Sequence, residues 1–315
     1  MPESRLRRGG AKIKIKEVMI MNKGFYTALG TPLDENLSVC AKSFANEIEQ
    51  QIEAGVSGLL VMGSMGNMTY LRDCEYAKVA KVAAEAAKGR VPVLVGVTDV
   101  AISRVMDRVA ALEGIKGIDD IVSTVPYYSV VSQDNIYDFY NEIANRSGRA
   151  TYLYDLAVVT KTATTPATVK RLWKNPLIKG IKSGNMVTHR VLMRAEDRPA
   201  DFDMMFSNID EFDIAYKYGI DKNLDGMFSA TPKTAQRMYK ALEAGDMATA
   251  AKELDAILAL RDLYISTGCL MAAFTHSMNL LGCDGFFGRD YDRFYNFSDE
   301  KKEKVAAMMK EMGEI

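Results

Sequence analysis

Lys182 and Tyr154 are the two residues of this sequence best placed to carry out chemistry. Lys182 ends the short apolar run 177–182, and Tyr154 ends a second such run, residues 150–154. A lysine at the end of a β-strand that faces a barrel interior is partly desolvated, which favours the neutral amine. A neutral amine can attack a ketone and form a Schiff base. If the chain folds into a barrel, we expect both residues to mark its active site, with the Tyr154 phenol passing protons.

A structural role for Lys182 is the alternative that spacing alone leaves open. Most of the 40 Lys and Arg residues fall on amphipathic segments, where we interpret them as solvated surface charge. Lys182 instead directly follows Ile181 on a predicted strand, where an unpaired ammonium would be costly. The lysine could therefore serve catalysis, or it could form a salt bridge with a nearby aspartate.

Two further segments carry groups that could contact a substrate. Residues 63–67 form a predicted turn whose backbone N–H groups, with the Ser64 hydroxyl, could bind a carboxylate. Such Gly-x-x-Gly turns are also often structural. Tyr127 and Tyr128 follow another apolar run, and their side chains should point to opposite sides of the chain. One could line the site while the other packs in the core or meets a neighbouring subunit.

The elements that must position these residues are predicted from alternation along the chain. Short apolar runs alternate with longer segments in which apolar residues recur at intervals of three and four. Eight candidate strands are the number that a closed (β/α)8 barrel requires. No G-x-G-x-x-G follows the first strand and no P-loop motif occurs, which disfavours a doubly wound nucleotide-binding sheet. The predicted strands are residues 25–29, 58–62, 91–97, 120–125, 151–154, 178–181, 203–206 and 225–228.

The chain is predicted to have three parts. Residues 23–232 form the barrel, and residues 233–315 form a helical extension, since the pattern after the eighth strand is wholly helical. Residues 1–22 are a basic extension, with Glu3 the only acidic residue among the first sixteen. We expect it to be disordered, or to precede a true start at Met19 or Met21, and only alternatively to be an arm for nucleic acid or membranes.

Composition excludes several classes of function. The chain is 48% hydrophobic with a net charge of −1, so no global field points to nucleic acid or to an anionic membrane. No apolar run approaches the roughly 20 residues that span a bilayer, and we expect a cytoplasmic protein. The four cysteines show no C-x-x-C spacing and should be reduced thiols. His189 and His276 are far apart, which disfavours zinc chemistry, although a magnesium site of carboxylates stays open.

These motifs together resemble the family of dihydrodipicolinate synthase and N-acetylneuraminate lyase, over roughly residue 24 to the C-terminus. The matching segments occur in order along the chain: residues 28–34, 63–67, 124–128, Tyr154 and 180–182. The resemblance implies a (β/α)8 barrel with a C-terminal helical extension, usually a homotetramer, that joins pyruvate to an aldehyde or releases it. No cofactor and no metal are implied, because the lysine imine itself acts as the electron sink.

The resemblance also implies roles for individual residues. Lys182 resembles the Schiff-base lysine and Tyr154 the proton-relay tyrosine. Ser64 matches the hydroxyl residue linked to that tyrosine, and Tyr128 matches the tyrosine that reaches across a subunit interface. The predicted substrate-contacting residues are Gly63, Met65, Val159, Asp210, Glu211 and Ser229.

The chain departs from the family pattern in ways that bear on the substrate. Met65 replaces a hydroxyl residue and Asn67 replaces a glutamate, so binding of a substrate carboxylate must depend on backbone N–H groups. Val159 stands where dihydrodipicolinate synthase has an arginine for the aspartate-semialdehyde carboxylate, and Lys161 is a poor substitute for it. The loss of that arginine disfavours lysine biosynthesis.

Two other positions bear on the lyase branch of the family. Asp210 and Glu211 match the acidic pair that binds sugar hydroxyls there, although they could instead stabilise a helix N-terminus. Gly184 stands where the lyases have a threonine, which weakens the sugar-acid assignment.

We therefore predict a class I lyase that forms a Schiff base between Lys182 and a 2-oxo acid. It would make or break a C–C bond to pyruvate, with a polyol, a small hydrophobic aldehyde or a sugar acid as the other half. The alternatives are dihydrodipicolinate synthase itself, a Schiff-base dehydratase of a deoxy sugar acid, and a family member that has lost catalysis.

Overall fold

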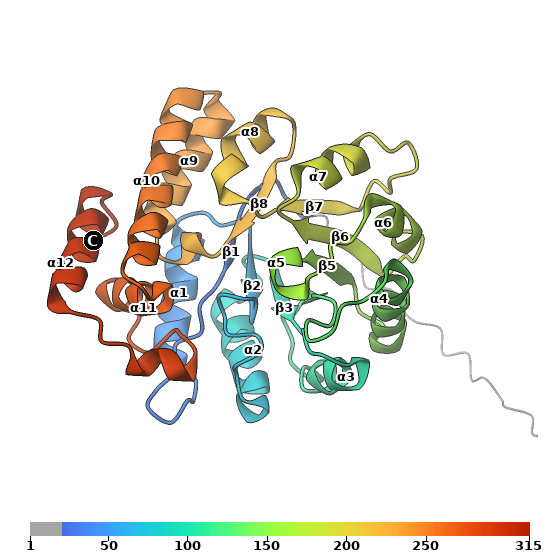
Figure 1. Cartoon of the computed structure of the whole chain (residues 1–315), viewed down its shortest axis with the longest axis horizontal. Coiled ribbons are helices and arrows are strands. Elements are labelled where there is room, and N and C mark those ends of the chain that lie inside the picture. The colour runs from blue at the N-terminus through green and yellow to red at the C-terminus, as the bar shows by residue number, and fades with distance from the viewer. Residues whose placement is uncertain (1–20) are drawn as a thin grey trace, which may run out of the picture.

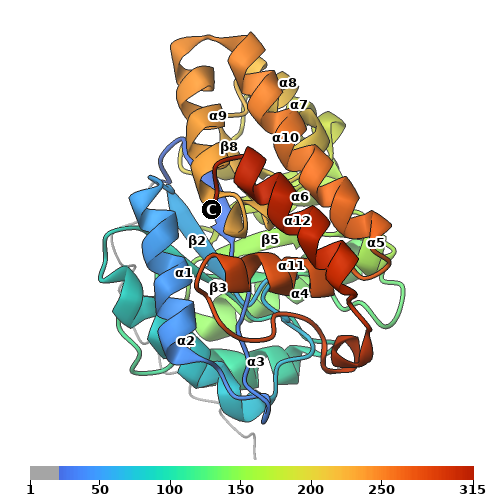
Figure 2. The same ribbon diagram turned by 90° about the vertical axis from the view of Figure 1, so that its left-hand side faces the viewer.

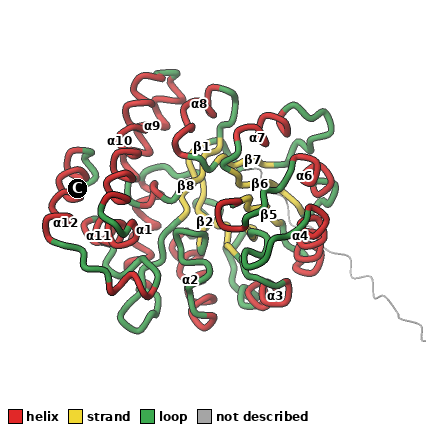
Figure 3. The backbone as a smooth tube through the Cα atoms, viewed as in Figure 1, coloured by secondary structure: helices red, strands yellow, loops and turns green. Residues whose placement is uncertain are grey.

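The strands of the protein close into a parallel barrel. The computed structural model describes residues 21–315, in which β1 to β8 pair in sequence order and β8 closes onto β1. Figures 1 and 3 show the barrel with helices around it. The (β/α)8 prediction is confirmed. The strands are β1 (Gly24–Ala28), β2 (Gly58–Val61), β3 (Val93–Gly96), β4 (Asp120–Ser123), β5 (Thr151–Asp155), β6 (Ile178–Ser183), β7 (Asp203–Phe206) and β8 (Lys222–Asp225).

Helices follow the strands and cover the barrel. In α4 the Ser132 hydroxyl accepts the Asn135 N–H at 3.1 Å, and Gly148 ends the helix with a φ of 62°. The helices of the barrel are α1 (Ala41–Glu53), α2 (Asp73–Ala87), α3 (Ile102–Ala110), α4 (Gln133–Ser147), α5 (Ala157–Thr160), α6 (Pro166–Leu172), α7 (Met186–Met193) and α8 (Phe212–Lys217). Short 3-10 helices are η1 (Ile209–Glu211), η2 (Met227–Ser229) and η3 (Asp290–Phe294).

The predicted eighth strand at residues 225–228 was wrong in position. The strand is Lys222–Asp225, and residues 227–229 form the 3-10 helix η2. The Asp225 carboxylate accepts the Met227 N–H at 2.8 Å and so starts this turn. Met227 and Phe228 are buried in the outer core, which is why they resemble a buried strand in the sequence.

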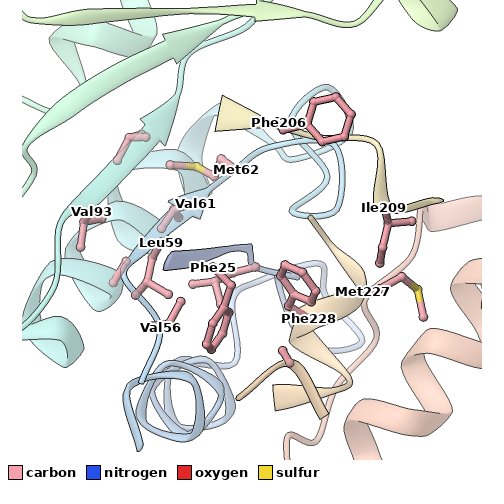
Figure 4. Close-up of a cluster of buried hydrophobic side chains, with 14 of the residues drawn as sticks. Phe25, Val56, Leu59, Val61, Met62, Val93, Phe206, Ile209, Met227 and Phe228 are labelled. Carbon is pink, nitrogen blue, oxygen red and sulfur yellow. The ribbon is translucent and has the colours of Figure 1, made fainter. Parts of the chain in front are cut away.

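Alternation along the strands produces two hydrophobic layers. Side chains such as Tyr26, Leu60 and Tyr152 fill the barrel interior. The residues between them on each strand point outward and pack against the helices, as Figure 4 shows around Phe25 and Phe228. The period of two in a strand explains why neighbours separate in this way.

The C-terminal part is helical and packs on the β8, β1 and α1 side of the barrel (Figure 2). Asn46 and Gln50 of α1 donate to the Gly282 and Leu281 carbonyls at 2.9 and 2.7 Å. Its helices are α9 (Pro232–Ala244), α10 (Met247–Ser266), α11 (Leu270–Leu280) and α12 (Asp299–Glu311). Within residues 21–315 no helix is long and apolar enough to cross a membrane. The predicted basic extension lies largely outside the described residues, and the boundaries at 22 and 232 stay predictions.

Candidate active site

Lys182 lies near the carboxyl end of β6, with its side chain directed to Tyr154 of β5. Residues 154 and 182 are partners across the two strands, and the Lys182 Nζ lies 4.0 Å from the centroid of the Tyr154 ring. Lys182 is 6% exposed. Lys179 on the same strand pairs with Asp201 at 2.6 Å, whereas Lys182 forms no salt bridge with any carboxylate that the structure describes. The salt-bridge alternative for Lys182 was therefore wrong, and the amine is held against an aromatic face.

Ser64 joins this pair from the turn that follows β2. Its hydroxyl lies 3.1 Å from the Tyr154 hydroxyl, and either oxygen can donate. The turn of residues 63–67 that carries Ser64 needs glycine at position 66, because a Cβ there would lie 2.9 Å from the Met62 nitrogen and 3.0 Å from the Leu29 carbonyl oxygen. The three groups thus come from two strands and from the turn after a third, with the tyrosine in the middle.

A layer of polar residues behind Lys182 fixes the ends of β5 and β6. The Ser183 hydroxyl donates to Asp155 at 2.8 Å, and the Thr164 N–H donates to the other Asp155 oxygen at 2.9 Å. The His189 Nε2 is 2.9 Å from the Ser183 carbonyl oxygen. Burial raises the pKa of Asp155 and lowers the pKa of His189 to about 4, so the imidazole is neutral near pH 7 and donates to that carbonyl.

A cavity of about 570 Å³ opens over the carboxyl ends of β5, β6 and β7, and we call it the mouth cavity. Its charged lining residues are Asp155 and Glu211, and no lysine or arginine of the described chain lines it. Its remaining lining residues are Leu156, Ala157, Val158, Ala163, Ser183, Gly184, Asn185, Met186, Val187, Ser207 and Asn208. The cavity is therefore partly apolar, and its described lining includes two carboxyl groups and no cation.

The structure separates the predicted acidic pair. Glu211 lines the mouth cavity, but Asp210 forms a 2.6 Å ion pair with Arg261 of α10. This ion pair lowers the pKa of Asp210, so the carboxylate is kept ionised and already has a partner. Of the predicted pair, only Glu211 lines the mouth cavity, and its contact with a substrate stays a prediction.

Ser229 and Val159 do not line the mouth cavity. Ser229 is 1% exposed, and its hydroxyl donates to Glu47 at 2.7 Å, in the layer between barrel and helices. Val159 is 40% exposed, while its neighbour Val158 lines the cavity and is 88% exposed. The four-residue helix α5 turns one valine toward the cavity and the other away from it.

Gly63 and Met65 lie in the Ser64 turn, but neither lines the mouth cavity. The Met65 side chain packs over Gly226, where an added Cβ would lie 2.6 Å from the Met65 Cγ. Tyr128 is 84% exposed and points away from the rest of the chain.

Three residues close to the site were missed by sequence reasoning. Asp155 could have been found, since it directly follows Tyr154. Arg261 could not, because it reaches the barrel from α10, 51 positions after its partner Asp210. Glu47 lies on a helix that looks amphipathic, yet it is fully buried, and burial raises its pKa to about 8.

These features define the class of protein: a (β/α)8 barrel with a buried lysine beside a tyrosine at the carboxyl ends of its strands. The sequence profile of the dihydrodipicolinate synthetase family matches residues 21–312. The chain belongs to this family, and it is a carbon–carbon lyase as the family's members are. The resemblance noted in the sequence is confirmed.

Individual relatives are distant but cover most of the chain. The 4-hydroxy-tetrahydrodipicolinate synthase of Bartonella bacilliformis is 30% identical over 254 residues, covering 78% of this chain and 84% of that protein. The corresponding enzyme of Bradyrhizobium diazoefficiens is 28% identical over 262 residues, covering 82% of this chain and 87% of that protein.

Solved structures share the fold at lower identity. The N-acetylneuraminate lyase of Fusobacterium nucleatum has a TM-score of 0.82 at 21% identity, over 93% of this chain and 99% of that one. YagE of E. coli K12, solved in complex with pyruvate, has a TM-score of 0.82 at 22% identity, over 92% of this chain and 98% of that one. At these identities the structures establish the fold alone.

Proposed function

We propose that the protein is a pyruvate aldolase in which Lys182 forms the Schiff base. The observation that carries the proposal is the cluster of Lys182, Tyr154 and Ser64, brought together from β6, β5 and the turn after β2. Lys182 is buried at the end of its strand and forms no salt bridge with a described carboxylate, and a lysine amine so placed can act as a nucleophile toward a ketone. The pyruvate complex of the related YagE supports the choice of 2-oxo acid.

The reaction that we propose needs only these side chains. The Lys182 nitrogen attacks the ketone carbon of pyruvate, and the carbinolamine loses water to give a protonated imine. Loss of a proton from the methyl group gives an enamine, whose carbon attacks the aldehyde carbon while the aldehyde oxygen gains a proton. Hydrolysis of the imine then releases product and restores the amine. The Tyr154 hydroxyl, hydrogen-bonded to Ser64, is placed to move these protons.

For the other half of the substrate, we propose an uncharged aldehyde with hydroxyl groups and an apolar side. The Glu211 carboxylate can accept hydrogen bonds from substrate hydroxyls, and the Asn208 amide can both accept and donate. Val158 and Met186 offer apolar contact. A second carboxylate on the substrate would lie near Glu211 with no lining cation to pair with. This disfavours aspartate semialdehyde, although the curated relatives named above are 4-hydroxy-tetrahydrodipicolinate synthases.

We further propose that the active protein is a homotetramer, in which Tyr128 of one subunit completes the site of another. Tyr128 is 84% exposed, and Val130 beside it is 72% exposed. Exposed aromatic and apolar side chains in the loop between β4 and α4 suit burial by a second copy. One structural relative is described as a monomeric dihydrodipicolinate synthase variant, so the assembly has to be measured for this chain.

The test is to trap the imine. The full-length protein is incubated with pyruvate and borohydride, its intact mass is measured, and the modified peptide is mapped. We expect one reduced pyruvyl adduct, on Lys182. Lys182→Met should abolish the adduct, while Lys179→Met is the matched control, because Lys179 is equally buried on the same strand but pairs with Asp201. A folded protein without an adduct, or an adduct that maps elsewhere, would contradict the proposal.

A further inference from the structure

We propose that a second cavity, in the C-terminal extension, is a ligand site for a small carboxylic acid with an apolar body, and that it acts on the Ser64 turn. The cavity has a volume of about 550 Å³ and lies between α11, the start of α12 and the loop that follows β1. Figure 2 shows α11 and α12 on the face of the molecule that carries it. None of its lining residues lines the mouth cavity.

The walls of this C-terminal cavity are largely apolar. Leu33, Ala272, Phe286 and Phe297 supply carbon surface. The Phe297 ring lies 5.8 Å from the His276 ring, which also lines the cavity. Pockets of this size, apolar with a few polar groups, are typical of small-molecule sites.

Arg293 supplies the charge that selects the ligand. Its guanidinium lies over the Phe286 ring at 4.8 Å and donates only to the backbone carbonyls of Asp34 and Glu35. It forms no salt bridge with an acidic side chain of residues 21–315, and its Nε is buried without a partner. An arginine that is partly buried and forms no ion pair favours an anionic ligand.

The other charged groups of the cavity are mostly engaged within the described chain. One Asp34 oxygen accepts two backbone N–H groups, and Asp292 is held by Arg289 at 2.7 Å. Lys302 is paired with Asp299 at 2.9 Å, and Glu35, which also lines the cavity, is exposed. Burial lowers the pKa of His276, and its Nε2 has no partner in the described chain, so a neutral imidazole is left with one unused hydrogen-bonding atom.

Hydrogen bonds connect this cavity to the active site. The cavity residue Thr275 accepts the Phe287 N–H at 3.1 Å, and the Phe287 carbonyl accepts the Asn67 side-chain N–H at 3.0 Å. Asn67 is 2% exposed, has a φ of 61°, and ends the turn that carries Ser64. A ligand that moves residues 286–287 would therefore shift Ser64 relative to Tyr154, and such a shift would change proton transfer.

Binding is tested with phenylacetate and indole-3-acetate as probes. Phenethylamine serves as the cationic counterpart and benzyl alcohol as the uncharged one. Calorimetry on the full-length protein reads binding without reference to activity. We expect the two carboxylates to bind about tenfold more tightly than their counterparts. Ala272→Trp should fill the cavity and weaken phenylacetate about tenfold or more, whereas Leu280→Trp, on the same helix but outside the cavity, should change its affinity less than about twofold. Equal affinity for all four probes, or an unchanged affinity for phenylacetate in Ala272→Trp, would contradict the proposed site.

Coupling is tested by hydrogen exchange of the peptide that contains residues 63–67. Phenylacetate should change its exchange rate in the wild-type protein. Asn67→Gly keeps the left-handed backbone but removes the donor to Phe287, and it should bind phenylacetate normally while losing this response. An unchanged exchange rate in the wild-type protein on binding would overturn the coupling. Neither readout depends on Lys182 chemistry, so failure here is distinct from failure of the proposed aldolase activity.

Discussion

The Lys182 Nζ lies 4.0 Å from the centroid of the Tyr154 ring because residues 154 and 182 are direct partners across β5 and β6. The strand register thus sets the distance between the proposed nucleophile and its proton relay. Ser64 completes the set by a 3.1 Å contact with the tyrosine hydroxyl. The predictions below start from this arrangement.

Tyr154→Phe should lower kcat by about 10²–10⁴-fold, since it removes the group proposed to move protons. Ser64→Ala should have a smaller effect, on the order of tenfold, because it removes one hydrogen bond to that group. Steady-state kinetics of pyruvate-dependent condensation or cleavage measures both, and circular dichroism checks folding. If Ser64→Ala lowers kcat more than Tyr154→Phe does, Tyr154 is not the main proton-transfer group.

Glu211→Gln should lower kcat/KM for a hydroxylated aldehyde about tenfold and leave pyruvate trapping on Lys182 unchanged. The carboxylate lines the mouth cavity, away from the proposed pyruvate site. Asp210→Asn is the matched control, because Asp210 is occupied by Arg261 and should matter less to the substrate. The hydroxyl-binding role of Glu211 is wrong if the Asp210 variant loses more activity toward that aldehyde.

Tyr128→Phe should slow turnover about tenfold without unfolding the chain, if the tyrosine hydroxyl acts in a neighbouring site. Sedimentation of the wild-type protein should then give a tetramer, and the variant should keep that assembly. Mixing Tyr128→Phe with Lys182→Met subunits offers a further check, because only hybrid assemblies pair an intact lysine with an intact tyrosine. Unchanged turnover in Tyr128→Phe would exclude the shared site.

Glu47 should make the stability of the protein depend on pH. Its ordinary pKa of 4.5 rises to about 8 on burial, although the carboxyl accepts from Gly30 and Ser229. Between these values the folded state holds a proton that the unfolded state has released, so the free energy of unfolding falls as pH rises from about 4.5 to about 8. Below this window the contribution is fully present.

The measurement for Glu47 is the thermal midpoint of wild-type protein and of Glu47→Gln between pH 5 and pH 8.5. Glutamine has no proton to lose, so the midpoint of the variant minus that of the wild type should grow as pH rises. A difference that stays constant, or that shrinks with rising pH, would show that Glu47 does not carry a raised pKa.

Removal of residues 1–20 should leave activity and thermal midpoint unchanged. The family match begins at residue 21 and β1 begins at Gly24, so the proposed site needs nothing before them. Kinetics of the shortened chain beside the full-length chain measures this. A large loss would mean that the basic extension takes part in folding or catalysis.

Local sequence was sufficient to predict the barrel and to place Lys182 and Tyr154 near the ends of two strands, while their catalytic roles stay predictions. Apolar runs of strand length between amphipathic helices predicted the parallel sheet, and a lysine ending such a run on β6 predicted a desolvated amine. Only the last strand was displaced, by a few residues, because the buried 3-10 helix Met227–Ser229 has the same apolar character as a strand.

Tertiary structure decided which neighbours each candidate has. Asp210 and Glu211 are adjacent in sequence and equally acidic, yet one pairs with Arg261 from α10 and the other lines the mouth cavity. Ser229 was expected at the substrate and instead bonds to Glu47 of α1. The periodicity of an element predicts which way a side chain points. The residue that it contacts comes from a segment distant in sequence, and the energy of that contact depends on burial and on the identity of the partner.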